Sequence, residues 1–319
     1  MRNYIIKRIL LAIVTIFVVM TITFFMMHAI PGTPFSTGND TMSAESLEVL
    51  MSRYGLDQPL YKQYVRYVTN ILKGDFGVSM SNGYRSVSDI ILTAFPVSAD
   101  LGIRALIFGT IAGILLGIEA ALHRGKPVDH LSTIVAIIGI SVPSFVLGTV
   151  FQTILGLGFS GWFKATFHTD YQVFPIARWQ SFRYTLIPSF VLGMGTVAGL
   201  ARLMRTSMLD VIGQDYVKTA KSKGISNLAI VWKHEVRNAM MPVVTVLGRM
   251  IGGVVTGSYI IESQFAIPGL GKYLVNSITA RDYTMTMGLT VFYSIFIVGS
   301  MLLVDLMYCV IDPRVRITK

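Results

Sequence analysis

Residues 210–242 read DVIGQDYVKTAKSKGISNLAIVWKHEVRNAMMP, a polar stretch between two strongly apolar segments. This stretch is too long for a simple connection between membrane helices, which needs only a few residues. Apolar residues recur four positions apart in two sets, which predicts two short helices. The sets are Ile212, Tyr216 and Ala220, and Leu228, Trp232 and Val236. Between them, Gly224 can take a positive φ and end the first helix, and Ser226 can cap the second.

Five basic residues surround these apolar positions, and they leave two interpretations of the stretch open. They are Lys218, Lys221, Lys223, Lys233 and Arg237. A basic helical hairpin can lie on anionic lipid headgroups. The same hairpin can instead be a docking element for a soluble partner, and the pattern alone does not separate the two.

The composition of the whole chain indicates the class of protein. The chain is 53% hydrophobic and 14% charged, with a mean hydropathy of +0.61, which is typical of an integral membrane protein. Runs of about 18 or more mostly apolar residues predict six transmembrane helices and hence an all-α fold. The expected spans are 9–30, 97–122, 131–157, 185–203, 239–261 and 283–311.

The distribution of Lys and Arg predicts the orientation in the membrane. Six spans place both termini on one side, and that side, which includes the 210–242 stretch, carries the excess of basic residues expected of cytoplasmic loops. The net charge of +10 is therefore explained without nucleic-acid binding. The first span is too long for a cleavable signal and is expected to be a retained anchor. Cys309 is the only cysteine, which excludes a disulfide framework.

Residues 31–96 separate the first two spans and are expected to form a small helical extracytoplasmic insertion. Two amphipathic helices are predicted there, the first ended by Gly55 and the second by Gly74. The insertion can be a cap resting on the outer membrane surface, or a contact surface for an external partner. The chain therefore divides into an N-terminal span (1–30), the insertion (31–96) and a five-helix core (97–319).

Glycine spacing in the core predicts close helix packing. Gly109, Gly113 and Gly117 form two consecutive GxxxG steps in the second span, a pattern that lets another helix approach closely. The same device is expected in three further pairs, Gly195 with Gly199, Gly248 with Gly252, and Gly253 with Gly257. Asp100 and Arg104 are spaced to pair on one helix face.

Three residues in the spans are candidates for a solute pathway. Ser141 and Pro143 predict a kink in the third span, which can line an aqueous path or serve packing alone. Arg249 falls near the middle of the fifth span, where an arginine costs about 2.5–3.5 kcal/mol even on lenient scales. It is expected either to offer charge to an anionic part of a solute or to pair with a structural partner.

The sequence contains no recognisable energy source or catalytic motif. It has no GxxxxGK[ST] phosphate loop, no zinc-protease HExxH and no GxSxG elbow. We therefore expect no enzyme activity, no cofactor and no metal. An ion-coupled secondary transporter is the rival class, but such carriers usually place acids near the midplane. Here Glu119 and Asp305 fall near the ends of their spans.

Residues 215–224 (DYVKTAKSKG) look like the EAA motif of bacterial ABC importer permeases, with Ala220 at its second alanine and Gly224 at its glycine. Lys218 and Thr219 stand where many members have Glu and Ala. Six further fragments, in the expected order, resemble the B-type permease subunit of oligopeptide and dipeptide importers. They are HAIPGTPF (28–35), YGLDQPLYKQY (54–64), GDFGVS (74–79), RNAMMPVVT (237–245), IPGLG (267–271) and DPRVRI (312–317).

This resemblance implies a type I ABC importer permease fold in a multi-pass protein of the bacterial cytoplasmic membrane. It implies a coupling loop at about 207–238 that inserts into a cytoplasmic ATPase, with Asp215, Tyr216, Lys218, Thr219, Ala220, Lys221 and Gly224 as the coupling residues. The implied function is half of the pathway of an oligopeptide importer, with a dipeptide or nickel importer as the alternative. The implied partners are a second homologous permease, two ATP-binding subunits, an extracytoplasmic peptide-binding protein, the peptide and membrane lipid.

Overall fold

The computed structural model describes residues 2–31, 35, 43–81, 83 and 85–311, and within these ranges the chain is helical apart from turns and one isolated bridge between Val78 and Ser86. The chain folds as two compact units. One unit is Met1–Val97 with Gly269–Lys319, and the other is Ser98–Pro268. The long helix α4 (Val87–Leu122) begins in the first unit and continues in the second.

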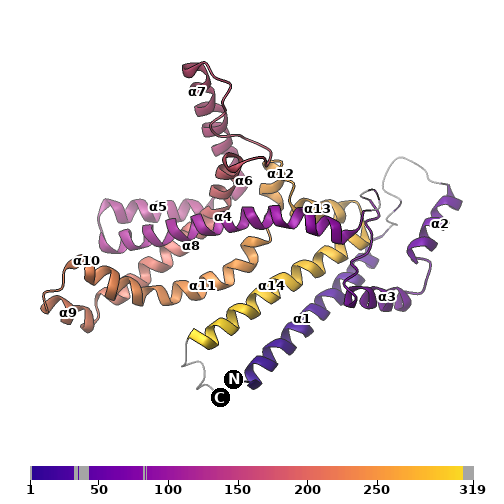
Figure 1. Cartoon of the computed structure of the whole chain (residues 1–319), viewed down its shortest axis with the longest axis horizontal. Helices are drawn as coiled ribbons and strands as arrows, with labels where there is room; N and C mark the ends of the chain where they lie inside the picture. The colour runs from indigo at the N-terminus through magenta and orange to yellow at the C-terminus, as the bar shows by residue number, and fades with distance from the viewer. Residues whose placement is uncertain (1, 32–34, 36–42, 82, 84, 312–319) are drawn as a thin grey trace. The chain divides into compact units, whose positions relative to one another are not determined.

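The first unit is built on two long helices, α1 (Arg2–Ala29) and α14 (Tyr283–Ile311), which lie side by side (Figure 1). Near the start of α1, Arg8 forms an ion pair of 2.8 Å with Asp305 of α14. At the other end, Phe24 and Met27 pack with Tyr283 and Met287. The helix α13 (Leu270–Thr279) packs on the first turns of α14.

The expected insertion holds the two predicted helices, α2 (Ala44–Tyr54) and α3 (Leu60–Leu72). Gly55 and Gly74 both take positive φ, of 70° and 78°, at the ends of these helices, so both predicted helix ends are confirmed. The fragment 28–35 lies partly, and the fragment 312–317 wholly, outside the described residues.

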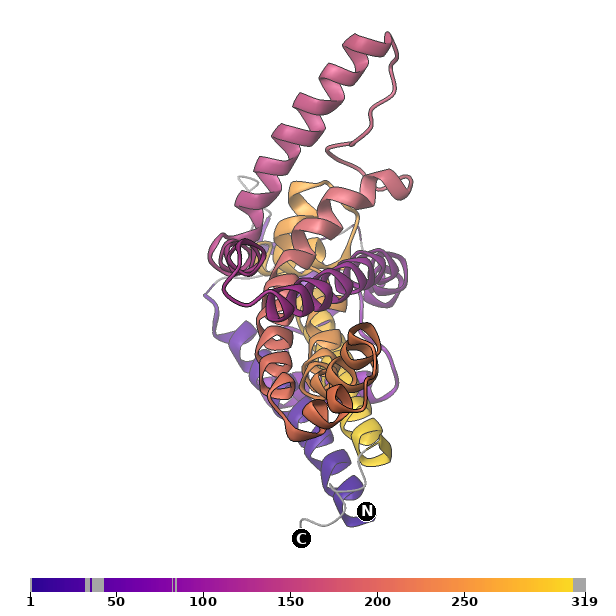
Figure 2. The same ribbon diagram turned by 90° about the vertical axis from the view of Figure 1, so that its left-hand side faces the viewer.

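The second unit contains α5 (Pro127–Ser141), α8 (Phe182–Ile212) and α11 (Arg237–Val255) together with most of α4. Its other helices are α6 (Ser144–Phe151), η1 (Gln152–Phe159), α7 (Ser160–Phe167), α9 (Asp215–Ser222), α10 (Asn227–Ile230), η2 (Val231–Val236) and α12 (Tyr259–Gln264). In Figure 2 the end of this unit that holds α9 and α10 faces the viewer. Both α5 and α11 pack against α8, which makes α8 the central helix of the unit.

Five helical stretches within the described residues are long and apolar enough to cross a membrane: Ile5–Ala29, Val87–Leu122, Ser144–Phe167, Phe182–Ile212 and Tyr283–Asp305. The expected fifth span, 239–261, is not among them, because α11 ends at Val255 and the chain turns at Gly257 before α12 begins at Tyr259. The expected third span, 131–157, is not one helix either. Val142 adopts an extended conformation (φ −87°, ψ 123°), so α5 ends at Ser141 and α6 begins at Ser144 in a different direction (Figure 1). The predicted kink is thus a full break, because proline disfavours the helical conformation in the residue before it.

The GxxxG prediction is confirmed for α4 and wrong for two of the three other pairs, Gly195 with Gly199 and Gly253 with Gly257. A Cβ added at Gly109, Gly113 or Gly117 of α4 would meet atoms of α8 within 2.9 Å, so these glycines let the two helices touch. By contrast, nothing lies within 4 Å of the corresponding positions at Gly195 and Gly199. Gly257 follows the end of α11 and takes a φ of 82°, so it ends a helix and does not pack one.

Candidate functional site

The helix α9 occupies the first half of the 210–242 stretch and is stabilised by local interactions. Its first turn carries Asp215, and an acid at a helix N-terminus is favourable because of the helix dipole. The Lys218 ammonium donates to the Asp215 carboxylate at 2.9 Å, and the Thr219 hydroxyl donates to the Asp215 carbonyl at 2.9 Å. Three of the predicted coupling residues therefore hold one another on the first turns of α9.

Gly224 ends this segment as predicted. Its φ is 73°, and its amide donates to the Lys221 carbonyl at 3.0 Å while the Ile225 amide donates to the Ala220 carbonyl at 3.4 Å. This pair of bonds is the Schellman arrangement, in which a left-handed residue, usually glycine, closes the helix. The result is a tight reversal between α9 and α10, without a flexible linker.

The buried face of this element differs from the predicted one. Val217, Ala220 and Ile230 are buried together, whereas Ile212 belongs to the end of α8 and Tyr216 points outward. The regular spacing was misleading because a helix boundary lies between Ile212 and Tyr216.

The second predicted short helix is also different in the structure. It begins at Asn227 and continues through η2 into α11 as one helical run. Ser226 occupies the N-cap position but its side chain makes no capping hydrogen bond. The segment is therefore a short helix, α9, joined by a tight turn to the start of a long one.

Four apolar side chains form an exposed surface on this element, called the α9–α10 surface below. They are Tyr216, Ile225, Leu228 and Trp232, with exposed fractions of 42%, 36%, 72% and 52%. Lys218 and Lys221 are exposed on the same element. Exposed apolar groups gathered beside polar ones are typical of a protein interaction site.

One hydrogen bond and one charge interaction link the α9–α10 surface to the helices behind it. The Asn238 side-chain amide of α11 donates to the Tyr216 hydroxyl at 3.1 Å. Glu235 is buried in η2, and this burial raises the pKa of its carboxyl while the charge of Lys221 partly offsets the rise. Both interactions connect α9 with the helical run that leads into α11.

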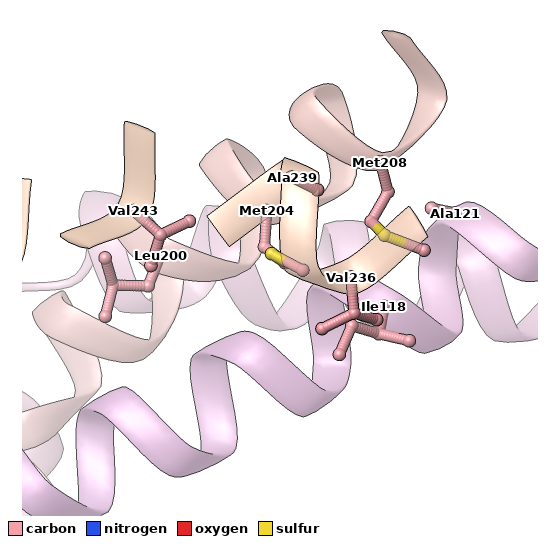
Figure 3. Close-up of a cluster of buried hydrophobic side chains, with 8 residues drawn as sticks. All are labelled: Ile118, Ala121, Leu200, Met204, Met208, Val236, Ala239 and Val243. Carbon is pink, nitrogen blue, oxygen red and sulfur yellow. The ribbon is translucent and has the colours of Figure 1, made fainter. Parts of the chain in front are cut away.

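A cluster of buried side chains lies in the same unit (Figure 3). Leu200, Met204 and Met208 of α8 meet side chains from α4 and α11. The partners are Ile118 and Ala121 from α4, and Val236, Ala239 and Val243 from η2 and α11. The cluster thus packs α4, α8 and α11 together behind α9, and close-packed interiors transmit strain.

The predicted pathway residues lie away from this element. Arg249 is exposed on α11, and no carboxylate lies within 4.0 Å of it among the described residues. Ser141 and Pro143 are exposed on either side of the break between α5 and α6. The contacts found in the described ranges do not join Arg249 to either of them.

Buried acids are the residues that the sequence did not reveal. The Ser98 hydroxyl donates to Glu262 at 2.8 Å, and Arg205 donates twice to Asp129, at 2.6 and 2.9 Å. Asp282 caps α14 through the Met285 amide and also accepts from Ser79. Apart from Met285, each partner is far away in sequence, so no local pattern could have identified those long-range contacts. The described residues contain no group of three or more His, Cys, Asp or Glu that could hold a metal.

Comparison with known proteins adds to this geometry. Residues 109–317 match a family model described as binding-protein-dependent transport system inner membrane component. Residues 1–102 match the model of the N-terminal part of such membrane components. Together these two matches cover nearly the whole chain.

Several relatives align with the chain along its length. The chain is 42% identical over 319 residues to the dipeptide transport system permease protein DppB of Bacillus subtilis (strain 168), covering 100% of this chain and 99% of that protein. It is 37% identical over 318 residues to the oligopeptide transport system permease protein OppB of Haemophilus influenzae, covering 99% and 100%. It is 37% identical over 317 residues to the glutathione transport system permease protein GsiC of Escherichia coli (strain K12), covering 99% of each.

One solved structure shows the same fold. It is a crystal structure of an amino acid ABC transporter with histidines, with a TM-score of 0.50 and 14% identity, covering 69% of this chain and 93% of that chain. At this identity the likeness concerns the fold alone.

Proposed function

Because the chain belongs to the family of binding-protein-dependent transport system inner membrane components, and is thus a multi-pass permease component of an ABC importer, we propose that its solute is a peptide. The observation that carries this proposal is the near-full-length similarity to permeases named for dipeptides, oligopeptides and glutathione. Glutathione is itself a short peptide. Our first assignment is an oligopeptide importer. The alternative is a dipeptide importer, which the 42% identity to a dipeptide permease supports.

The α9–α10 surface is proposed as the docking site for a cytoplasmic ATPase. Tyr216, Leu228 and Trp232 offer apolar side chains to a partner, with Lys218 and Lys221 beside them. The element keeps its shape through the burial of Val217 and Ala220 and through the turn at Gly224. Since the chain lacks a phosphate loop, the energy of ATP has to enter through such a contact.

The packing around α9 supports a mechanism for using that energy. A push on α9 reaches α11 through the bond between Tyr216 and Asn238. It reaches α8 through Val217 and Ala220, whose buried cluster packs against Val211, and the cluster of Figure 3 joins α8 to α4. Rigid-body movement of packed helices is a common way to switch between two states. We propose that this movement alternately opens the peptide pathway to the two sides of the membrane.

The pathway itself is proposed to lie between this chain and a second homologous permease. Arg249 supports this arrangement, because an unpaired arginine on a membrane helix should face a partner or a water-filled cavity. A peptide carries a carboxylate that such a charge can attract. Two ATP-binding subunits, an extracytoplasmic peptide-binding protein and cytoplasmic termini complete the proposed assembly.

Peptide uptake into vesicles that contain the assembled complex tests the proposed function. We expect uptake of a labelled peptide to require hydrolysable ATP on the ATPase side and to persist when an ionophore dissipates ion gradients. A complex supplied with a non-hydrolysable ATP analogue is the control. Uptake that collapses with the ionophore while ATP is maintained would instead identify an ion-coupled carrier.

A further inference from the structure

The helix α3 has an apolar face that nothing in the described protein covers. Tyr61, Val65 and Leu72 are exposed to 66%, 59% and 81%. Their spacing of four and seven residues places them on one side of the helix. No residue of α3 is fully buried, although its sequence is strongly amphipathic. An exposed apolar stripe of this kind requires an occupant.

One flank of α3, beside this apolar face, is anchored to α1. The Tyr64 hydroxyl lies 2.7 Å from the Thr21 hydroxyl, and the Tyr64 ring packs against the rings of Phe24 and Phe25. One turn away, His28 bonds to the Gln63 side chain at 2.9 Å. The helix α3 is therefore attached to α1 and does not stand apart from it.

These contacts define the depth of α3 relative to the membrane. Thr21 precedes Ala29, the last residue of α1, by about 12 Å at 1.5 Å per residue. The apolar part of α1 that crosses the membrane extends to Ala29. A side chain of α3 that reaches Thr21 thus reaches into the outer part of the hydrocarbon layer, so α3 lies at the boundary between hydrocarbon and headgroups.

The charges of α3 fit the same location. Lys62 and Arg66 are the charged residues within Leu60–Leu72, which contains no acid, and Lys73 follows immediately. All three basic residues are exposed, and their spacing places Lys62 and Arg66 together on the flank of the helix next to Val65. A helix with a basic polar face and an apolar face rich in large side chains lies in the plane of the membrane interface.

We propose that α3 is an interfacial helix that inserts Tyr61, Val65 and Leu72 into the lipid leaflet at the C-terminal end of α1, with Lys62, Arg66 and Lys73 among the lipid phosphates. The occupant of the apolar face is lipid because α3 is attached to α1, whose apolar surface is largely exposed. This location ties the expected insertion to the membrane independently of the transported solute.

Spin labels at single positions test the proposal. Cys309 is first replaced by serine, since it is the only cysteine, and cysteine is then introduced at Val65 or at Leu72. A matched label at Lys62, on the basic flank of α3, is the control. The labelled full-length chain is placed with its partners in phospholipid bilayers, and accessibility to oxygen and to a water-soluble nickel chelate is measured.

We expect the oxygen-to-nickel accessibility ratio at Val65 and Leu72 to exceed that at Lys62 several-fold. High nickel access at Val65 and Leu72 would place the face in water and overturn the proposal. Low access to both reagents would show that a protein covers the face, which also overturns it. If one labelled variant cannot be purified, the other decides, and failure to purify both would assign the face to protein packing.

Discussion

Arg249 is a charged side chain in α11 with no carboxylate within 4.0 Å among the described residues. An arginine at the centre of a membrane helix costs about 2.5–3.5 kcal/mol or more unless water or a partner compensates it. The fold of this one chain does not supply that compensation in the described ranges. We therefore propose that Arg249 faces the pathway or a second subunit.

Replacing Arg249 by methionine tests this interpretation. If the guanidinium attracts the peptide carboxylate, Arg249→Met should lower peptide uptake by about tenfold or more, the effect of losing at least 1.4 kcal/mol of interaction. Arg249→Lys, which keeps the charge, should retain a larger share of uptake. Uptake assays and size-exclusion chromatography of the assembled complex supply the two measurements. Loss of assembly with both variants would show that Arg249 is structural.

At the residue scale, sequence patterns located turns better than buried faces. Gly224 was predicted correctly because a positive φ depends mainly on the residue type itself. The face formed by Val217, Ala220 and Ile230 was missed, since it depends on where α8 ends and how α9 turns back. Burial is a property of neighbours that a four-residue spacing does not specify.

At the element scale, we propose that α9 acts as a short rigid lever. The Schellman turn at Gly224, the buried contact of Ala220 with Ile230 and the Tyr216–Asn238 bond hold its position. A lever transmits displacement only if its turn is stiff. Small changes at the turn should therefore affect coupling more than they affect folding.

Alanine at Gly224 tests the stiffness of the turn, with Gly74→Ala as the matched control. Both glycines have positive φ, of 73° and 78°, and open space around a new Cβ, so each substitution should cost about 1–2 kcal/mol of backbone strain. We expect Gly224→Ala to lower peptide uptake per ATP hydrolysed, while Gly74→Ala does not. Uptake and ATP hydrolysis are measured in the same vesicles. Equal loss in both variants would attribute the effect to stability alone.

A second element-scale contact joins the α4–α5 turn to α8. Arg205 donates two hydrogen bonds to Asp129, and the Gly125 amide donates a third at 3.0 Å. These bonds hold the pKa of the Asp129 carboxyl, which precedes the expected third span, well below its usual range. The pair connects α5 and α8 close to the segment that carries α9.

Removing this pair should destabilise the second unit. Arg205→Gln leaves Asp129 buried without its partner, which typically costs about 3–5 kcal/mol. We expect the lower end, because the Arg205 side chain is 31% exposed. Arg202→Gln removes an exposed arginine one turn earlier and should have little effect. The remaining folded protein is measured by size-exclusion chromatography after heating, and equal heat resistance of the two variants would contradict the prediction.

At the scale of the whole molecule, the chain divides into two units that the span pattern did not anticipate. The first and last helices, α1 and α14, pack together, so the first unit joins the two ends of the sequence. The expected boundaries at residues 30 and 96 followed hydropathy. The boundary between the two units lies inside α4, between Val97 and Ser98, next to the expected boundary at 96, and residues 1–30 and 31–96 belong to one unit.

The sequence by itself determined the protein class, the positions of most membrane helices and the turns at glycine. These features depend on transfer of apolar side chains into lipid and on local backbone conformation, both of which are properties of short segments. Only the tertiary structure decided which glycines face another helix, where the third span breaks, and which acids are buried. Those features depend on atoms brought together from distant parts of the chain, as Arg205 and Asp129 or Ser98 and Glu262 show.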